Sequence, residues 1–186
     1  MIYIHKQLKS VFPADPYPYE EQLKEVSENI RKWLEESGSP AEKTGLYLAT
    51  SNAGVAESIA FWKNALEHSP RFTNPANFNW TLSNGPASLL SRLLKIKGPC
   101  HTLIGKSGAL TGCFFHASDD LEAGIVSTAL IAGLDIHEKE VTFNICLVSK
   151  SDSNQPIEWN DVRKWERDDE KATSFLSRIF GTNTLA

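Results

Sequence analysis

The chain has few of the residues that build metal centres and disulfide frameworks. Its 186 residues include three cysteines, five histidines and one methionine. Cys100, Cys113 and Cys146 are odd in number and too scattered for a C-x-x-C motif. Free cysteines of this kind favour the reducing cytosol, where buried thiols are common. We therefore expect a cytoplasmic protein with no metal and no cofactor.

Long apolar runs and an excess of positive charge are also missing. No segment approaches the roughly 20 apolar residues that cross a bilayer, and His5 and Lys6 interrupt the apolar amino terminus, unlike a signal peptide. The net charge of -4 gives no general attraction to nucleic acid or anionic lipid. Hydrophobic residues at 41% and charged residues at 23% are ordinary for a globular protein. We expect neither nucleic acid nor membrane as a partner.

The order of apolar segments predicts one α/β domain over residues 1–186. Strands are expected at residues 2–5, 45–52, 100–105, 125–134 and 141–149. Helices are expected at residues 19–36, 54–68, 83–98, 107–124 and about 159–180, with loops at 12–19 and 69–80. Alternation of strands with helices predicts a mixed five-stranded sheet covered by helices on both faces.

One expected helix is amphipathic, and one expected strand is short and apolar. In the helix at 54–68, a single stripe carries Val55, Ile59, Trp62 and Leu66. The segment CHTLIG, 100–105, is interpreted as a short buried strand.

The stretch GPCHTLIGKSGALTGC, 98–113, contains a Gly-Lys-Ser, so a phosphate loop has to be considered. Such a loop needs a glycine five residues before the second one, because its backbone must curl to aim several N–H groups at the phosphates. Counting back from Gly105, that position is Cys100, and Gly98 lies two residues too early. The spacing therefore excludes the loop, and we expect no nucleotide site here.

The same stretch comes close to a nucleophile elbow around Ser107. The pattern G-x-S-x-G fails because Ala109 replaces its last glycine, although a small residue there is tolerable. Helix geometry places His116 about 13 Å along the axis and on the opposite face, and His101 lies about 20 Å away along an extended strand. His5, His68 and His137 have positions that the sequence does not fix. An unassisted serine is a poor nucleophile, so Ser107 is interpreted first as a helix cap.

Residues 72–133 resemble the amino-terminal half of the β-ketoacyl synthases, condensing enzymes with a thiolase-like fold. The similar features are, in order, Ser83-Asn84-Gly85-Pro86-Ala87, the turn Leu93-Leu94-Lys95-Ile96-Lys97-Gly98-Pro99, the strand 101–105, the helix 107–122, Gly124 and Ala129-Leu130-Ile131-Ala132-Gly133. The register has no gaps and covers about a third of the chain densely. The resemblance implies a thiolase-like half.

In that register Ser107 occupies the position of the family's acyl-accepting cysteine. Cys113 lies six residues into the helix and Cys100 at the far end of the strand, so neither replaces it. The family also requires two histidines, or a histidine and an asparagine, from a carboxyl-terminal half beyond this chain's length. The resemblance therefore implies a ketosynthase-like subunit without standalone activity, similar to the chain-length factors that accompany intact ketosynthases in polyketide-type and aryl polyene systems.

The resemblance also implies partners. In the family, the strand before the nucleophile pairs with its counterpart across a two-fold axis, and an apolar edge strand left bare favours aggregation. A full-length ketosynthase is the expected partner, and a homodimeric scaffold or relic with no ligand is an alternative. The alternative to any pairing is that the helix at about 159–180, rich in tryptophan and phenylalanine, covers the surface that the missing half would have buried. An acyl carrier protein could bind the basic residues Arg92, Lys95 and Lys97, which a solvated helix face explains equally well. A further alternative is an acyltransferase or thioesterase that uses Ser107.

Overall fold

The computed structural model describes residues 2–13, 20–105, 107–137, 140–150 and 156–157. The strands are β1 (Ile2–Pro13), β2 (Thr44–Thr50), β3 (Cys100–Ile104), β4 (Thr128–His137), β5 (Glu140–Ser149) and β6 (Pro156–Ile157). The helices are α1 (Glu20–Glu36), α2 (Val55–His68), α3 (Pro75–Phe78), α4 (Gly85–Leu93) and α5 (Ser107–Glu122). Short 3₁₀ turns are η1 (Ala41–Lys43), η2 (Pro70–Phe72) and η3 (Asn79–Thr81). The helix expected at about 159–180 lies outside the described residues.

The strands form one mixed sheet in the order β3-β2-β4-β5-β1-β6. β2 pairs parallel with both β3 and β4, whereas β4 with β5, β5 with β1 and β1 with β6 pair antiparallel. Five long strands and the two-residue β6 confirm the expected mixed α/β sheet.

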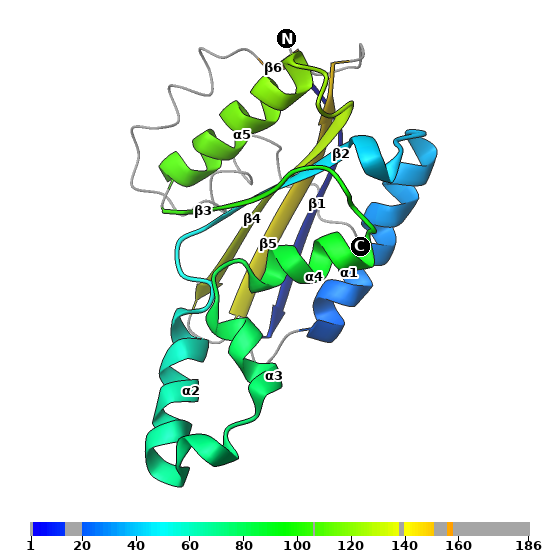
Figure 1. Ribbon diagram of the computed structural model, residues 1–186. Helices are drawn as coiled ribbons and strands as arrows, with labels where there is room; N and C mark the ends of the chain where they lie inside the picture. The colour runs from blue at the N-terminus through cyan, green and yellow to red at the C-terminus, as the bar shows by residue number, and fades with distance from the viewer. Residues whose placement is uncertain (1, 14–19, 106, 138–139, 151–155, 158–186) are drawn as a thin grey trace.

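Helices cover both faces of this sheet, as expected (Figure 1). Alternate residues of each strand point to opposite faces, so Leu46 and Leu48 of β2 pack under α1 and α4. Their neighbours Tyr47 and Ala49 pack under α5. The near-continuous apolar character of β2, β4 and β5 follows from this two-sided burial.

The largest differences from the sequence prediction concern four segments. β4 runs from Thr128 to His137 rather than over 125–134. β1 runs to Pro13 rather than ending near residue 5, because its antiparallel ladder with β5 continues and buries Leu8 and Phe12. The expected loop at 69–80 contains η2, α3 and η3, where the Asn74 side chain caps α3 by accepting the Ala76 N–H at 3.0 Å. The helix expected at 83–98 ends at Leu93, and Lys95 adopts a positive φ of 57°.

Gly98 therefore does not end a helix but lets the chain approach β2 closely. A Cβ atom at this position would lie 2.3 Å from the carbonyl oxygen of Thr44. The next carbonyl, of Pro99, accepts the Leu46 N–H at 2.8 Å and starts the β2–β3 ladder. The Gly98-Pro99 turn is thus required by the backbone contact that aligns β3.

We predict that Gly98→Ala lowers the free energy of unfolding by about 1–3 kcal/mol, because backbone rather than a flexible side chain must move. Urea denaturation measures the effect. Gly108→Ala on α5 is the matched control, since its Cβ would meet nothing within 4 Å, and it should be neutral or slightly stabilising. Equal stabilities of the two variants would contradict the close approach.

Three weak acids are buried between the sheet and α5: Cys113, Cys146 and Tyr47. Burial raises the pKa of the Cys113 thiol to about 12 and raises that of Cys146 further. Burial, and then the hydrogen bond that the Tyr47 hydroxyl donates to Asp120 Oδ2 at 2.6 Å, raises the pKa of Tyr47. All three groups are held in their neutral forms in the folded protein.

This burial predicts alkaline sensitivity. A group whose pKa is higher in the folded than in the unfolded protein contributes its full stability below the unfolded-state pKa. That contribution is lost as the pH rises from the unfolded-state pKa through the folded-state pKa. The free energy of unfolding should fall from about pH 8.5, by up to about 1.4 kcal/mol per pH unit for each thiol, and tyrosine should add to the slope above about pH 10. Denaturation at pH 7 to 10 tests this. The Cys113→Ala/Cys146→Ala double variant should flatten the slope, and an unchanged slope would contradict the prediction.

Candidate functional site

Ser107 is the first residue of α5 and lies three positions after Ile104, the end of β3. Gly105 donates its N–H to the Thr50 carbonyl at 2.9 Å, so the ends of β2 and β3 are tied together just before the helix. Ser107 therefore lies at the amino terminus of a helix that follows a strand, as the sequence predicts. Its role as the residue replacing a nucleophilic cysteine stays a prediction.

Four of the five histidines lie in three separate places. His101 of β3 and His116 of α5 stack with ring centroids 5.4 Å apart, and Tyr47 stacks on the other side of His101 at 5.6 Å. His5 Nε2 lies 2.7 Å from Ser149 Oγ at the opposite end of α5. His68 is exposed at the end of α2. The sequence indicated neither the His101–His116 stack, which depends on how α5 packs back over β3, nor the His5–Ser149 pair, which joins residues 144 positions apart.

The two cysteines of the stretch 98–113 are unreactive in different ways. Cys113 is fully buried on the face of α5 that packs against the sheet. Cys100 is exposed on β3, but burial of its thiol still raises its pKa, which keeps it protonated. A thiolate is the reactive form, so neither residue has the environment of a catalytic thiol.

No cluster of three or more histidine, cysteine or acidic side chains suited to a metal ion occurs among the described residues. In the same part of the chain, no helix has the length and apolar character to cross a membrane.

β3 is the outermost strand on its side of the described sheet. Cys100, His101 and Ile104 are exposed, with Ile104 at 69%. The prediction of an edge strand is therefore confirmed, while the interpretation of CHTLIG as buried is wrong. Apolar composition predicts burial, but β3 has a neighbouring strand on one side only, which leaves Cys100, His101 and Ile104 accessible.

The open edge of β3 presents backbone hydrogen-bonding groups. Pro99 and Gly105 make their hydrogen bonds to β2, and in a parallel ladder the residues bonded to one neighbour alternate with those facing the other way. The N–H and C=O groups of Thr102 and Ile104 therefore face away from β2. They are positioned to accept a further strand.

The second exposed surface is the segment from Val55 to Leu82, here called the α2–α3 arm, which projects away from the sheet (Figure 1). The sequence places an apolar stripe on α2, and such a stripe normally faces a core. Here the stripe is open, and it continues into the rest of the arm. The exposed large apolar side chains are Val55, Ile59, Trp62, Leu66, Phe72, Phe78 and Leu82.

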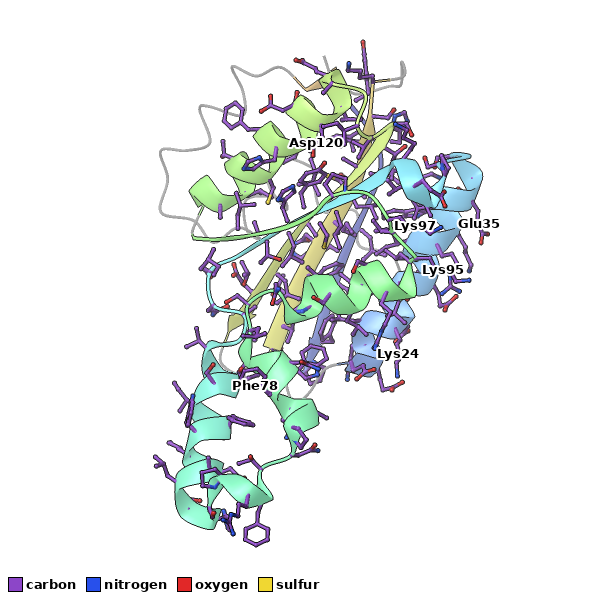
Figure 2. All side chains as sticks on the ribbon, viewed as in Figure 1. Lys24, Glu35, Phe78, Lys95, Lys97 and Asp120 are labelled. Carbon is purple, nitrogen blue, oxygen red and sulfur yellow. The ribbon has the colours of Figure 1, made fainter. Side chains whose placement is uncertain are left out.

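The arm packs only through its inner side. Phe61 meets Phe78, which is labelled in Figure 2, edge to face at 5.9 Å, and Ala65 is buried beside it. Trp62 and Leu66, at 60% and 84% exposure, point away from this contact. The arm is thus a small helical unit whose larger apolar face is uncovered in the chain alone.

The base of the arm is held firmly. Gly54, at φ 83°, lies against the backbone of residues 81–82, where a Cβ would approach Thr81 O at 2.9 Å, and Ser58 Oγ donates to the same carbonyl at 3.0 Å. Asp135 of β4 accepts both the N–H and the hydroxyl of Ser51, at 2.7 and 2.6 Å. These contacts fix the direction in which α2 leaves β2.

Of the basic residues proposed to bind a carrier protein, Arg92 lies in the last turn of α4, and Lys95 and Lys97 follow the helix. Lys95 and Lys97 lie together in Figure 2, but Lys97 pairs with Glu42 at 2.7 Å, and Arg92 lies 4.0 Å from Glu20. Acidic neighbours therefore reduce the positive field of this surface. Binding of a carrier protein here stays a prediction.

Comparison of the sequence with protein families and with curated proteins finds no match. Solved structures do match. A chain of the ketosynthase (ApeO) in complex with its chain length factor (ApeC) from Xenorhabdus doucetiae superposes with a TM-score of 0.63 and 13% identity, over 82% of this chain and 58% of that one. The ishigamide ketosynthase/chain length factor gives 0.55 and 13%, over 61% and 37%. Ketosynthase twelve of the bacillaene synthase from Bacillus amyloliquefaciens gives 0.52 and 15%, over 69% and 28%.

These likenesses define the class of fold. The chain is a thiolase-like α/β protein built like part of the ketosynthases and chain length factors, which confirms the resemblance found in the sequence. It spans 37% and 58% of the length of the first two matched chains.

Proposed function

We propose that the chain is a ketosynthase-like subunit that is non-catalytic in the condensation reaction and pairs with a full-length ketosynthase in polyketide, fatty acid or aryl polyene type synthesis. The observation that carries the proposal is the exposed surface formed by the β3 edge and the α2–α3 arm. Matched structures that contain a ketosynthase with its chain length factor support a pairing role for such a fold.

The two exposed parts are continuous. Ile104, at the end of β3, is the register partner of Thr50, the last residue of β2. α2 begins five residues later at Val55, so its open stripe starts at the corner where the β3 edge ends. Monomeric proteins rarely leave contiguous apolar patches of several hundred Å² exposed, and larger patches mark interaction sites. A partner that adds a strand to β3 would reach the arm as well.

The chemistry of this chain favours a supporting role in the complex over catalysis of condensation. Ser107 offers an alcohol where the family uses a thiolate, and the field of a helix amino terminus is too weak to ionise an alcohol. Cys100 and Cys113 are held protonated, as described above. In the proposed complex, the partner supplies the thiolate and the decarboxylation residues. This chain contributes the apolar arm, which shapes or stabilises the partner's acyl tunnel.

The buried free thiols agree with a cytoplasmic location, where such thiols stay reduced. An acyl carrier protein would then approach the complex rather than this chain alone.

Reconstitution tests the proposal. Condensation by a full-length ketosynthase from the same organism should depend on the chain, and Ser107→Ala should support the same rate as the wild type. If Ser107→Ala abolished turnover of an acyl thioester, Ser107 would instead be the nucleophile of an acyltransferase or thioesterase. If the ketosynthase were indifferent to the chain, a homodimeric scaffold would be favoured.

A further inference from the structure

A cavity of about 560 Å³ opens at the end of the sheet remote from Ser107. It lies beside the last turn of α5 and is lined by side chains that include His5, Ser39, Leu121, Thr128, Ser149 and Lys150. Ser107 is fourteen residues from Leu121 along α5, which corresponds to about 21 Å. The cavity is therefore separate from the position that the ketosynthase register assigns to a nucleophile.

His5 reaches this cavity because β1 is irregular at that residue. Ile4 pairs with Val148 and Lys6 with Leu147, which leaves His5 as an extra residue in the ladder. Such β-bulges redirect a side chain and are common next to active sites. Here the bulge is at the residue whose Nε2 lies 2.7 Å from Ser149 Oγ.

The other hydroxyls of the cavity have different partners. Ser127 Oγ donates to the Lys43 carbonyl at 3.3 Å. Ser39 Oγ lies 2.6 Å from Thr128 Oγ1 and 2.8 Å from Ser37 Oγ. Ser149 is thus the hydroxyl of this cavity that the described structure pairs with an imidazole. Burial lowers the pKa of His5, so its ring is neutral at neutral pH and can accept a proton.

We propose that Ser149 and His5 form a serine–histidine dyad that cleaves esters or thioesters of small acyl groups. The pair has the hydrogen-bond distance that a nucleophile and its general base require. The cavity has the size of a small-molecule site, and its apolar lining, from Leu121, Val126 and Leu147, suits an acyl chain. Lys150 contributes an ammonium group to the same lining, available to the negative charge that develops on a carbonyl oxygen.

The reaction is a double displacement. Ser149 Oγ attacks the acyl carbonyl carbon while its proton passes to His5 Nε2. The tetrahedral intermediate collapses, the bond to the alcohol or thiol breaks, and the leaving group takes the proton from His5. Water then attacks the Ser149 ester with His5 again as base, and the carboxylic acid and free Ser149 are released.

A fluorophosphonate probe tests the dyad, because it phosphonylates activated serines. The full chain should be labelled, and peptide mass spectrometry should locate the adduct on Ser149. Ser149→Ala should abolish labelling, and His5→Gln should slow it at least about 100-fold, the range of a general base. Hydrolysis of p-nitrophenyl butyrate should fall in parallel.

Ser107→Ala is the matched control, and it should be labelled at the wild-type rate. An unlabelled wild-type chain, or an adduct on another residue, would overturn the dyad. Because the adduct is mapped on the wild type, misfolding of a variant cannot obscure the result. Binding of a ketosynthase by Ser149→Ala is expected to match the wild type, so failure of the dyad and failure of the proposed pairing are distinguishable.

Discussion

Trp62→Glu is expected to reduce binding of the chain to its full-length ketosynthase at least about 100-fold while leaving the melting temperature unchanged. Trp62 lies on the open stripe of α2 with 60% of its surface exposed, so the folded monomer gains little from it. Tryptophan is the residue type most often responsible for interface energy, and its loss typically costs about 2–4 kcal/mol. Burying a carboxylate in its place adds a desolvation penalty.

Asn64→Glu is the control for this variant. Residue 64 is also exposed on α2, but it lies about 180° around the helix from the centre of the stripe. The control adds the same charge to the same helix and should bind like the wild type. Biolayer interferometry against the immobilised ketosynthase gives both affinities, and equal losses for the two variants would show that the stripe is not the contact.

Thr102→Pro is expected to weaken the same binding at least about tenfold without unfolding the chain. Its N–H faces away from β2, so proline removes a donor from the open edge and keeps the β2–β3 ladder. Proline is tolerated on edge strands for this reason, and it prevents a new strand from pairing there. Thr102→Ala keeps the N–H and should retain binding. Full binding by the proline variant would exclude strand addition at β3, while leaving contacts through the arm possible.

The sheet could be predicted from the sequence because its central strands are buried on both faces. Apolar runs bounded by turn residues, as at β4 and β5, are typical of strands in this position. The Gly-Pro turn before β3 is explained by the close approach of its backbone to β2. The length of β1 could not be predicted from the sequence because its carboxyl-terminal part mixes lysines and serine with apolar residues. Its length depends on the partner strand β5.

For the α2–α3 arm, the sequence predicts the apolar face but not what covers it. Periodicity established that Val55, Ile59, Trp62 and Leu66 share one face of α2, but it carries no information on what covers that face. The direction of α2 depends on tertiary contacts of Gly54, and these join residues about 27 positions apart. An apolar stripe therefore predicts burial in something, which can be the protein's own core or a partner.

The candidate sites also differ in whether local sequence determines their positions. The backbone position of Ser107 was predictable because local signals, a strand followed by a small-residue helix, define it. The His5–Ser149 pair was not, since it joins residues 144 positions apart through a bulge that has no sequence signature. Local chemistry can be inferred from spacing, whereas long-range pairs require the sheet register.

The central claim is that this chain binds a ketosynthase, and the mass of the purified complex tests it most directly. The chain and a full-length ketosynthase from the same organism should be co-expressed, purified through a tag on the chain, and analysed by size-exclusion chromatography with light scattering. We predict equal amounts of the two proteins in one species with the mass of a heterodimer. A stable homodimer of this chain that leaves the ketosynthase behind would contradict the proposal.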